Sequence, residues 1–176
     1  MEYQQLTQIL PADFNPSSRV WIYQGSRSFS EKETEEINEQ LHMFYAQWTS
    51  HGAEVKGWAK LLFGQFIVVL ADEEATGVSG CSTDSMVRVI KSLERQYQVN
   101  FFDRLTLTFL VNGKAQMLPM NQVAYALEKG FIWEETPFFN NTVGTKAELE
   151  ANWLQPLKAS WLWNRLVRSA GAAENG

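Results

Sequence analysis

The sequence predicts an α+β fold: a ferredoxin-like, split β-α-β arrangement with helices on one face of an antiparallel sheet. Through residue 111, segments of strand and helix character alternate as strand, helix, strand, strand, helix, strand. Two of these segments carry apolar residues at helical spacing. Short turns separate strands that are neighbours in the chain, which suits antiparallel pairing. We therefore expect one domain over residues 1–130, followed by an extension over residues 131–176.

The first strand and the first long helix have clear signals. Arg19 to Gln24 is rich in β-branched and aromatic residues, and Gly25 follows it. Ser30-Glu31-Lys32-Glu33 has the capping-box pattern, in which a hydroxyl and a carboxylate each accept from an exposed amide. An apolar stripe then runs to Trp48 at steps of four, three and four. We expect His51-Gly52 to close this helix, with the glycine in the left-handed conformation.

Two strands and a second helix follow. Strands are predicted at Glu54 to Leu62 and at Gln65 to Ala71, with Phe63-Gly64 as the turn between them. The second strand is nearly all apolar, so it is expected to be central in its sheet or covered on both faces. Met86 to Tyr97 has apolar residues at steps of four, three and four, which predicts an amphipathic helix.

The rest of the domain is predicted to be a hairpin and a short helix. Leu105 to Val111 alternates between apolar and polar residues at its start, and Asn112-Gly113 is a strong signal of a tight turn into Lys114 to Leu118. Pro119 then opens a short helix, Met120 to Lys129. The strand at Leu105 is the one that completes the ferredoxin-like sheet.

Residues 131–176 differ in composition and predict an aromatic-rich helical extension. Helices are expected at Lys146 to Asn152 and after Pro156, and the small polar residues from Ser169 onward predict a flexible tail. Tryptophans in the last helix are expected to pack on the domain, on a second copy of the chain or on another protein. The alternative is attachment to a membrane surface, because basic residues lie beside the two tryptophans; the four residues are Trp161, Trp163, Arg165 and Arg168.

Composition narrows the class of protein. The formal net charge is -5, from 15 basic and 20 acidic residues, which argues against nucleic-acid binding. The single cysteine cannot form an internal disulfide, and residues 1–5 lack the pattern of a signal peptide. No apolar run reaches the roughly 18 residues that span a bilayer. We expect a cytoplasmic protein with no transmembrane segment, and the sequence identifies no cofactor.

The loop Thr76 to Ser85 is the candidate site. It places two glycines, several hydroxyls, a carboxylate and Cys81 at the start of a predicted helix. The glycines are expected to allow turns closed to other residues, and Ser82, Thr83 or Asp84 to cap the helix. The exposed amides at a helix start favour an anion, and two arginines could complete the charge. The expected binding residues are Ser79, Gly80, Ser82, Thr83, Asp84, Arg27 and Arg104.

Three other interpretations of this region stay open. In the first, Cys81 is the nucleophile of a thiol-dependent enzyme and His51 its base, with His42 as a weaker choice. In the second, the loop is only a capped helix start with a small buried cysteine. In the third, carboxylates that follow or precede strands hold a divalent cation, although no spacing motif supports this and no metal site is predicted; they are Asp72, Asp84 and Asp103.

Several segments resemble a family of uncharacterised bacterial proteins that are often labelled automatically as ABC-transporter ATPases. The segments are Arg19 to Gln24, Arg27, Trp48 with His51-Gly52, Ser79 to Asp84, and Phe102-Asp103-Arg104. The resemblance covers residues 6–130 and implies no known activity. It does not make the chain an ATPase, because no Gly-x-x-x-x-Gly-Lys-[Ser/Thr] run occurs and the lysine that would hold the phosphates is missing. We therefore expect a binding module for an anionic small molecule or a protein partner.

Overall fold

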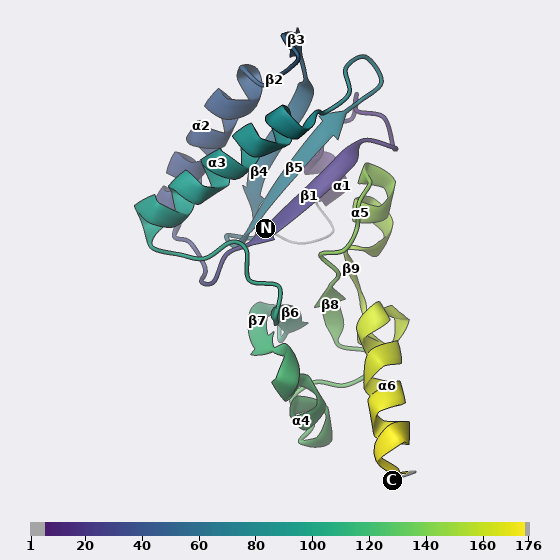
Figure 1. The fold of residues 1–176 in the computed structure, drawn as a ribbon. Coiled ribbons are helices and arrows are strands. Elements are labelled where there is room, and N and C mark those ends of the chain that lie inside the picture. Colours follow the sequence, from purple (N-terminus) through teal and green to yellow (C-terminus); the bar gives the residue numbers. More distant parts are fainter. Residues whose placement is uncertain (1–5, 175–176) are drawn as a thin grey trace. The chain divides into compact units, whose positions relative to one another are not determined.

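The computed structural model describes residues 6–174, which form two compact units (Figure 1). The first unit comprises Met1–Asp103 and Thr142–Glu150, and the second comprises Arg104–Asn141 and Ala151–Gly176. Both units combine helices with antiparallel strands, so the predicted α+β class is confirmed. The division differs from the predicted boundary at residue 130, because it falls at residue 103 and a later segment returns to the first unit.

The sheet of the first unit has three antiparallel strands, in the order β1-β5-β4. They are β1 (Arg19–Gln24), β5 (Phe66–Asp72) and β4 (Lys56–Leu62). Every residue of β5 is buried, as its apolar run predicts for a central strand. The turn between β4 and β5 contains Phe63 and Gly64, both with positive φ.

Two helices, α2 (Glu31–Ala46) and α3 (Gly80–Tyr97), cover one face of this sheet (Figure 1). The predicted capping box of α2 is present, because Ser30 accepts from the Glu33 amide while Glu33 accepts from the Ser30 amide. The apolar stripes of both helices pack onto the sheet in one core, with Ile37 and Ile90 among their buried residues.

The predicted end of α2 at His51-Gly52 is wrong. The helix ends at Ala46, and the next residues form a small hairpin of β2 (Thr49–Ser50) and β3 (Ala53–Glu54). His51 has φ 51° and Gly52 has φ 80°, so both turn residues are left-handed, as in the type I′ turn that matches strand twist. His51 is therefore a turn residue rather than a helix cap.

The other face of the sheet is covered by α1 (Leu6–Ile9) and α5 (Lys146–Asn152) (Figure 1). The Nζ of Lys146 is buried there and donates to two main-chain oxygens, that of Pro11 at 2.9 Å and that of Phe14 at 3.2 Å. These bonds attach α5 to the segment that precedes β1. They explain why residues 142–150 belong to the first unit.

The ferredoxin-like topology is not what the structure shows. It requires the strand after α3 to pair with the outer edge of β1. That strand, β6 (Thr106–Val111), instead pairs with β7 (Lys114–Pro119) and β8 (Pro137–Phe139) in the second unit. Part of the outer edge of β1 is occupied by another segment, since Arg19 forms an antiparallel bridge with Thr145 and the Val20 amide donates to the Gly144 oxygen.

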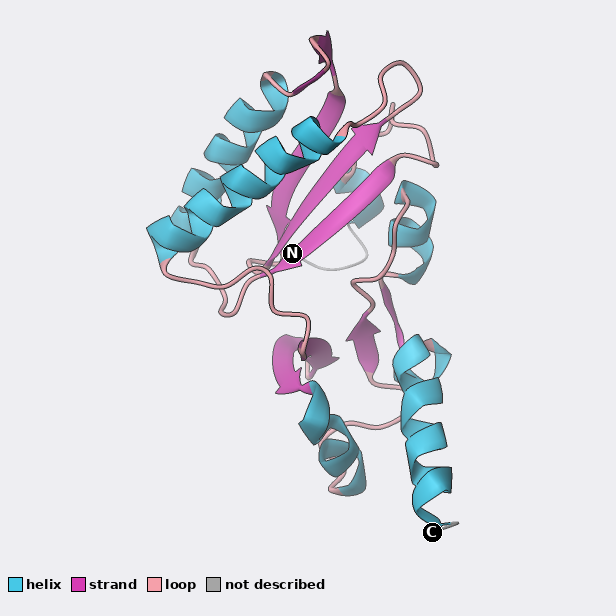
Figure 2. Ribbon diagram, viewed as in Figure 1, coloured by secondary structure: helices cyan, strands magenta, loops and turns pink. Residues whose placement is uncertain are grey.

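The second unit contains a four-stranded antiparallel sheet in the order β7-β6-β8-β9. Figure 2 draws the strands of both units in magenta. Its strands besides β6 are β7 (Lys114–Pro119), β8 (Pro137–Phe139) and β9 (Leu154–Pro156). The predicted hairpin is confirmed, because Asn112 and Gly113 connect β6 to β7 with φ 51° and 74°.

The helices of the second unit pack around the apolar residues of this sheet. They are η2 (Met120–Gln122), α4 (Val123–Glu128), η3 (Leu157–Ala159) and α6 (Trp161–Glu174). Leu162 is fully buried in this core, and Trp161 and Trp163 pack against it, so the tryptophans contact their own chain. The helix α6 extends to Glu174, beyond the expected start of a flexible tail at Ser169.

Candidate functional site

The start of α3 is capped by Ser79. Its Oγ accepts from the Ser82 amide at 3.3 Å, and the Oγ of Ser82 accepts from the Ser79 amide at 2.8 Å, a reciprocal pair of the capping-box kind. The expectation that Ser82, Thr83 or Asp84 is the cap is therefore wrong. Ser82 and Thr83 lie in the first turn, where the Thr83 hydroxyl donates to the Ser79 oxygen, and Asp84 is exposed on the helix.

The glycines of the loop do not have the expected role. Neither Gly77 nor Gly80 has a positive φ, and a Cβ added to either would meet no atom within 4 Å. Gly80 is simply the first residue of α3. Other residue types could therefore adopt the conformation of this loop at both glycine positions. The predicted site now depends on the polar groups of the loop and no longer on its glycines.

Arg27 does not join the loop, and Arg104 belongs to the other unit. Arg27 pairs with Glu33 at 2.8 Å and donates to the main-chain oxygen of Tyr97, at the last residue of α3. An 18-residue helix is about 27 Å long, so Arg27 and Ser79 lie at opposite ends of α3. Arg104 is the first residue of the second unit and is not part of the loop's unit.

A cleft of about 630 Å³ lies between the C-terminal half of α2 and the N-terminal half of α3. It brings together Cys81 and His51, the two residues predicted for thiol chemistry. Cys81 is exposed there, which corrects the expectation of a buried cysteine. The lining comprises Gln40, Met43, Phe44, Gln47, Trp48, Thr49, His51, Cys81, Ser85, Arg88, Val89 and Ser92.

Sequence reasoning missed Arg88, although a signal for it exists. Cys81, Ser85, Arg88 and Ser92 all line the cleft and follow one another at steps of four, three and four. This polar stripe lies beside the apolar stripe that predicts the helix, and the same helical period generates both. Reading the second stripe would have placed Arg88 and Cys81 on one face of α3.

The electrostatics of the cleft differ from those of the whole chain. Among the described residues no aspartate or glutamate lines it, although the chain carries a formal net charge of -5. Arg88 is its only permanently charged lining residue, and within residues 6–174 the structure shows no ion pair or hydrogen bond of its guanidinium. Ser79 satisfies the amides of Ser82 and Thr83, so the amides of Gly80 and Cys81 are the ones left for a ligand.

Trp48 forms the floor of the cleft. Its indole is buried and packs on Phe44 and Trp21, with ring centroids 5.1 Å and 6.2 Å away. Beneath it lies Gly57, where an added Cβ would come within 2.6 Å of the Trp48 ring. The absence of a side chain at Gly57 therefore leaves the space that the indole fills.

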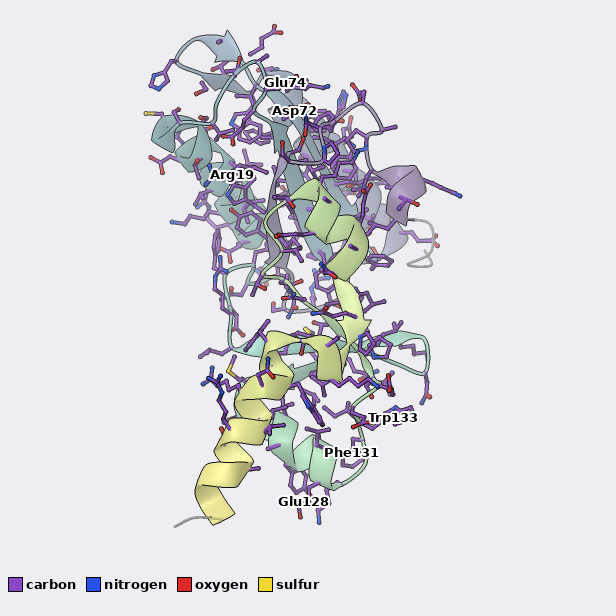
Figure 3. All side chains as sticks on the ribbon, turned by 90° about the vertical axis from the view of Figure 1, so that its right-hand side faces the viewer. Arg19, Asp72, Glu74, Glu128, Phe131 and Trp133 are labelled. Atoms are coloured by element: carbon purple, nitrogen blue, oxygen red, sulfur yellow. The ribbon has the colours of Figure 1, made fainter. Side chains whose placement is uncertain are left out.

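The aspartates considered for a metal are not gathered into a site. Within the described residues, no group of three or more His, Cys, Asp or Glu side chains is placed to hold a metal ion. Asp72 is buried at the end of β5, and hydrogen bonds from the Asn15 amide, then the Glu74 amide and the charge of Lys56, lower its pKa. Figure 3 labels Asp72 together with Arg19 and Glu74. Asp72 thus holds the segment that precedes β1 through the amide of Asn15.

Comparisons with known proteins give no family. No protein-family model, no curated protein and no solved structure matches the chain. The resemblance to uncharacterised bacterial proteins stays a prediction. In the described residues, no helix is both long enough and apolar enough to cross a membrane.

Proposed function

We propose that the first unit binds an anionic small molecule in the cleft between α2 and α3. The observation that carries this proposal is Arg88, which within the described part of the chain has no ion pair and lines a cleft without a carboxylate. A guanidinium without an ion pair offers a planar pair of donors to a phosphate or carboxylate.

The rest of the lining suits a ligand that is polar at one end. The amides of Gly80 and Cys81 and the positive end of the α3 dipole lie near the Cys81 end of the cleft. Hydroxyl and amide side chains add donors, while Met43, Phe44 and Val89 supply apolar surface. This combination is typical of small-molecule sites, in which a few polar groups orient a ligand against apolar walls.

The test is a titration of the full chain with pyrophosphate and with citrate, followed by calorimetry. Arg88→Gln is expected to weaken binding about tenfold or more, because one charge-assisted interaction is lost. Arg95→Gln is the matched control, since Arg95 is exposed on the same helix and does not line the cleft. Equal losses in the two variants, or no binding of either anion, would refute the proposal.

A thiol-dependent enzyme is the second candidate, favoured by the presence of Cys81 and His51 in one cleft. A thiolate activated by a base reacts with iodoacetamide well below the pH of about 8.5 at which free cysteine ionises. Because Cys81 is the only cysteine, the label reports on it alone. Fast alkylation at pH 7 that is lost in His51→Ala supports the enzyme, and ordinary alkylation in both proteins supports the binding module.

A protein partner is the third candidate, and exposed aromatic residues favour it. Phe131 and Trp133 follow α4 and are 67% and 64% exposed (Figure 3). Large exposed aromatic side chains are enriched at protein interfaces. If a second copy of the chain is the partner, light scattering at rising concentration will show a dimer that Phe131→Ser with Trp133→Ser abolishes. A monomer at all concentrations excludes self-association.

We also propose a cytoplasmic location, which suits a chain with one cysteine and no internal disulfide.

A further inference from the structure

We propose that the second unit has a binding site of its own, for an aliphatic carboxylate, in a groove that α6 forms with residues 105–106 and 119–124. The groove has a volume of about 570 Å³, inside the roughly 300 to 1,000 Å³ that small-molecule sites occupy. All of its lining belongs to the second unit. It shares no residue with the α2–α3 cleft, so this site goes beyond the function proposed above.

The walls of the groove are mostly apolar. Leu105 lies at its rim and is 69% exposed, which leaves a large apolar side chain in water when the groove is empty. Covering such surface is favourable by about 0.8 kcal/mol for each buried methylene, so an aliphatic chain gains affinity as it lengthens. The apolar lining residues are Leu105, Pro119, Met120, Ala124, Leu162 and Leu166.

The charge of the groove selects the head group of the ligand. Among the residues whose side chains the structure describes, Arg165 is the one ionised residue in the lining, and no aspartate or glutamate accompanies it. Within the described residues, the structure shows neither an ion pair nor a side-chain hydrogen bond of Arg165. An apolar groove that has a free guanidinium complements a molecule with an aliphatic chain and one anionic end. A carboxylate matches the guanidinium in a bidentate manner.

The experiment is a titration of the full chain with octanoate, decanoate and dodecanoate below their micelle concentrations, followed by tryptophan fluorescence. Trp161 and Trp163 lie on α6, so they report on the groove. We expect saturable binding whose affinity rises about fourfold per added methylene. Decanol is expected to bind about tenfold more weakly than decanoate, because it lacks the charge that pairs with Arg165.

Variants separate the groove from general surface effects. Arg165→Gln is expected to remove the preference for decanoate over decanol, while Arg168→Gln leaves it, because Arg168 is exposed on α6 outside the groove. Ala124→Phe fills the groove and should abolish binding, with circular dichroism to confirm the fold. Leu105→Ser is a second test of whether the ligand binds in the groove, and it should weaken binding. Because Leu105 is exposed, this change has little effect on folding.

Three results would overturn this proposal. The first is the absence of saturable binding of any of the three acids. The second is an equal response of the two arginine variants, which would mean that surface charge alone attracts the ligand. The third is unchanged binding in Ala124→Phe and Leu105→Ser, which would place the ligand elsewhere on the chain.

Light scattering in the same samples tests whether a second copy of the chain occupies the groove instead. A dimer that forms without ligand and is lost in Ala124→Phe would make the groove an interface between copies and would overturn the proposal.

Discussion

The indole N–H of Trp48 donates a hydrogen bond of 2.9 Å to the main-chain oxygen of Ser82. Trp48 follows the end of α2, and Ser82 lies in the first turn of α3, so this buried bond joins the two helices at the end of the cleft where Cys81 lies. The geometry of the proposed anion site therefore depends on Trp48, although Trp48 does not supply the positive charge of the site.

Replacing Trp48 by phenylalanine removes this bond and keeps an aromatic ring. We expect a loss of about 1 to 3 kcal/mol in the free energy of unfolding, because the buried oxygen loses a partner and the smaller ring leaves space. Urea denaturation measures it. Trp58→Phe is the control, since the structure shows no hydrogen bond of the Trp58 indole in its described part, and its loss should be smaller.

A methyl group at Gly57 is expected to displace the Trp48 indole. The added Cβ would lie 2.6 Å from the ring, closer than real contacts allow, and overpacking of this kind typically costs about 1 to 3 kcal/mol. Gly57→Ala should thus lower the melting temperature and shift tryptophan emission. Gly80→Ala should do neither, because its Cβ meets nothing within 4 Å and alanine is a better helix former. A stable Gly57→Ala protein with unchanged emission would contradict the packing described here.

Stability is expected to fall with acidification below about pH 4.5. The hydrogen bond from Arg27, with a second from the Ser30 amide, lowers the pKa of Glu33 from 4.5 to about 2, and that of Asp72 is lowered as well. The unfolded chain thus binds more protons in this range, so the stabilisation is complete above pH 4.5 and is lost as the pH approaches 2.

Glu33→Gln tests this origin, because glutamine keeps the capping-box geometry and does not titrate. Urea midpoints between pH 7 and pH 2.5 should fall less steeply in this variant than in the original chain. Glu35→Gln, at an exposed position of α2, should leave the slope unchanged. Identical slopes in all three proteins would assign the acid sensitivity to other carboxylates.

Asn38 accepts a hydrogen bond from a buried amide in the edge strand β4. Its side-chain oxygen accepts from the Leu61 amide at 2.7 Å, and Leu61 is 1% exposed. Asn38→Ala leaves this amide without that partner, which is expected to cost about 1 to 3 kcal/mol. Asn38→Asp keeps an acceptor and should lose less, and Glu39→Ala, exposed on the same helix, should be close to neutral in chemical denaturation.

Local signals predict the elements of this fold well. Three predictions depend on only a few adjacent residues each, and all three are confirmed. They are the buried strand β5, the capping box at Ser30 and the Asn112-Gly113 hairpin. The pairing of β6 is not local. Its alternating pattern shows that it is a strand with one apolar face, but the same pattern fits either sheet, so its neighbour depends on residues far along the chain.

The candidate site was predicted in part for a similar reason. The loop before α3 stands out, and Cys81 and His51 do share a cleft. Which hydroxyl caps the helix could not be predicted, because Ser79, Ser82 and Thr83 are all suitable by type and only the full set of backbone contacts selects Ser79. Arg88 has a regular spacing from Cys81, yet its free guanidinium is a property of its surroundings in space.

The return of residues 142–150 to the first unit has a consequence for synthesis of the chain. Part of the outer edge of β1 bonds to residues 144 and 145, which the ribosome makes more than a hundred residues after β1 itself. Until they emerge, that edge is open to pairing with other chains. Nascent chains that stop before residue 142 should therefore be cleaved faster by protease within β1 than chains with residue 150 exposed, and equal cleavage would show that the edge closes in another way.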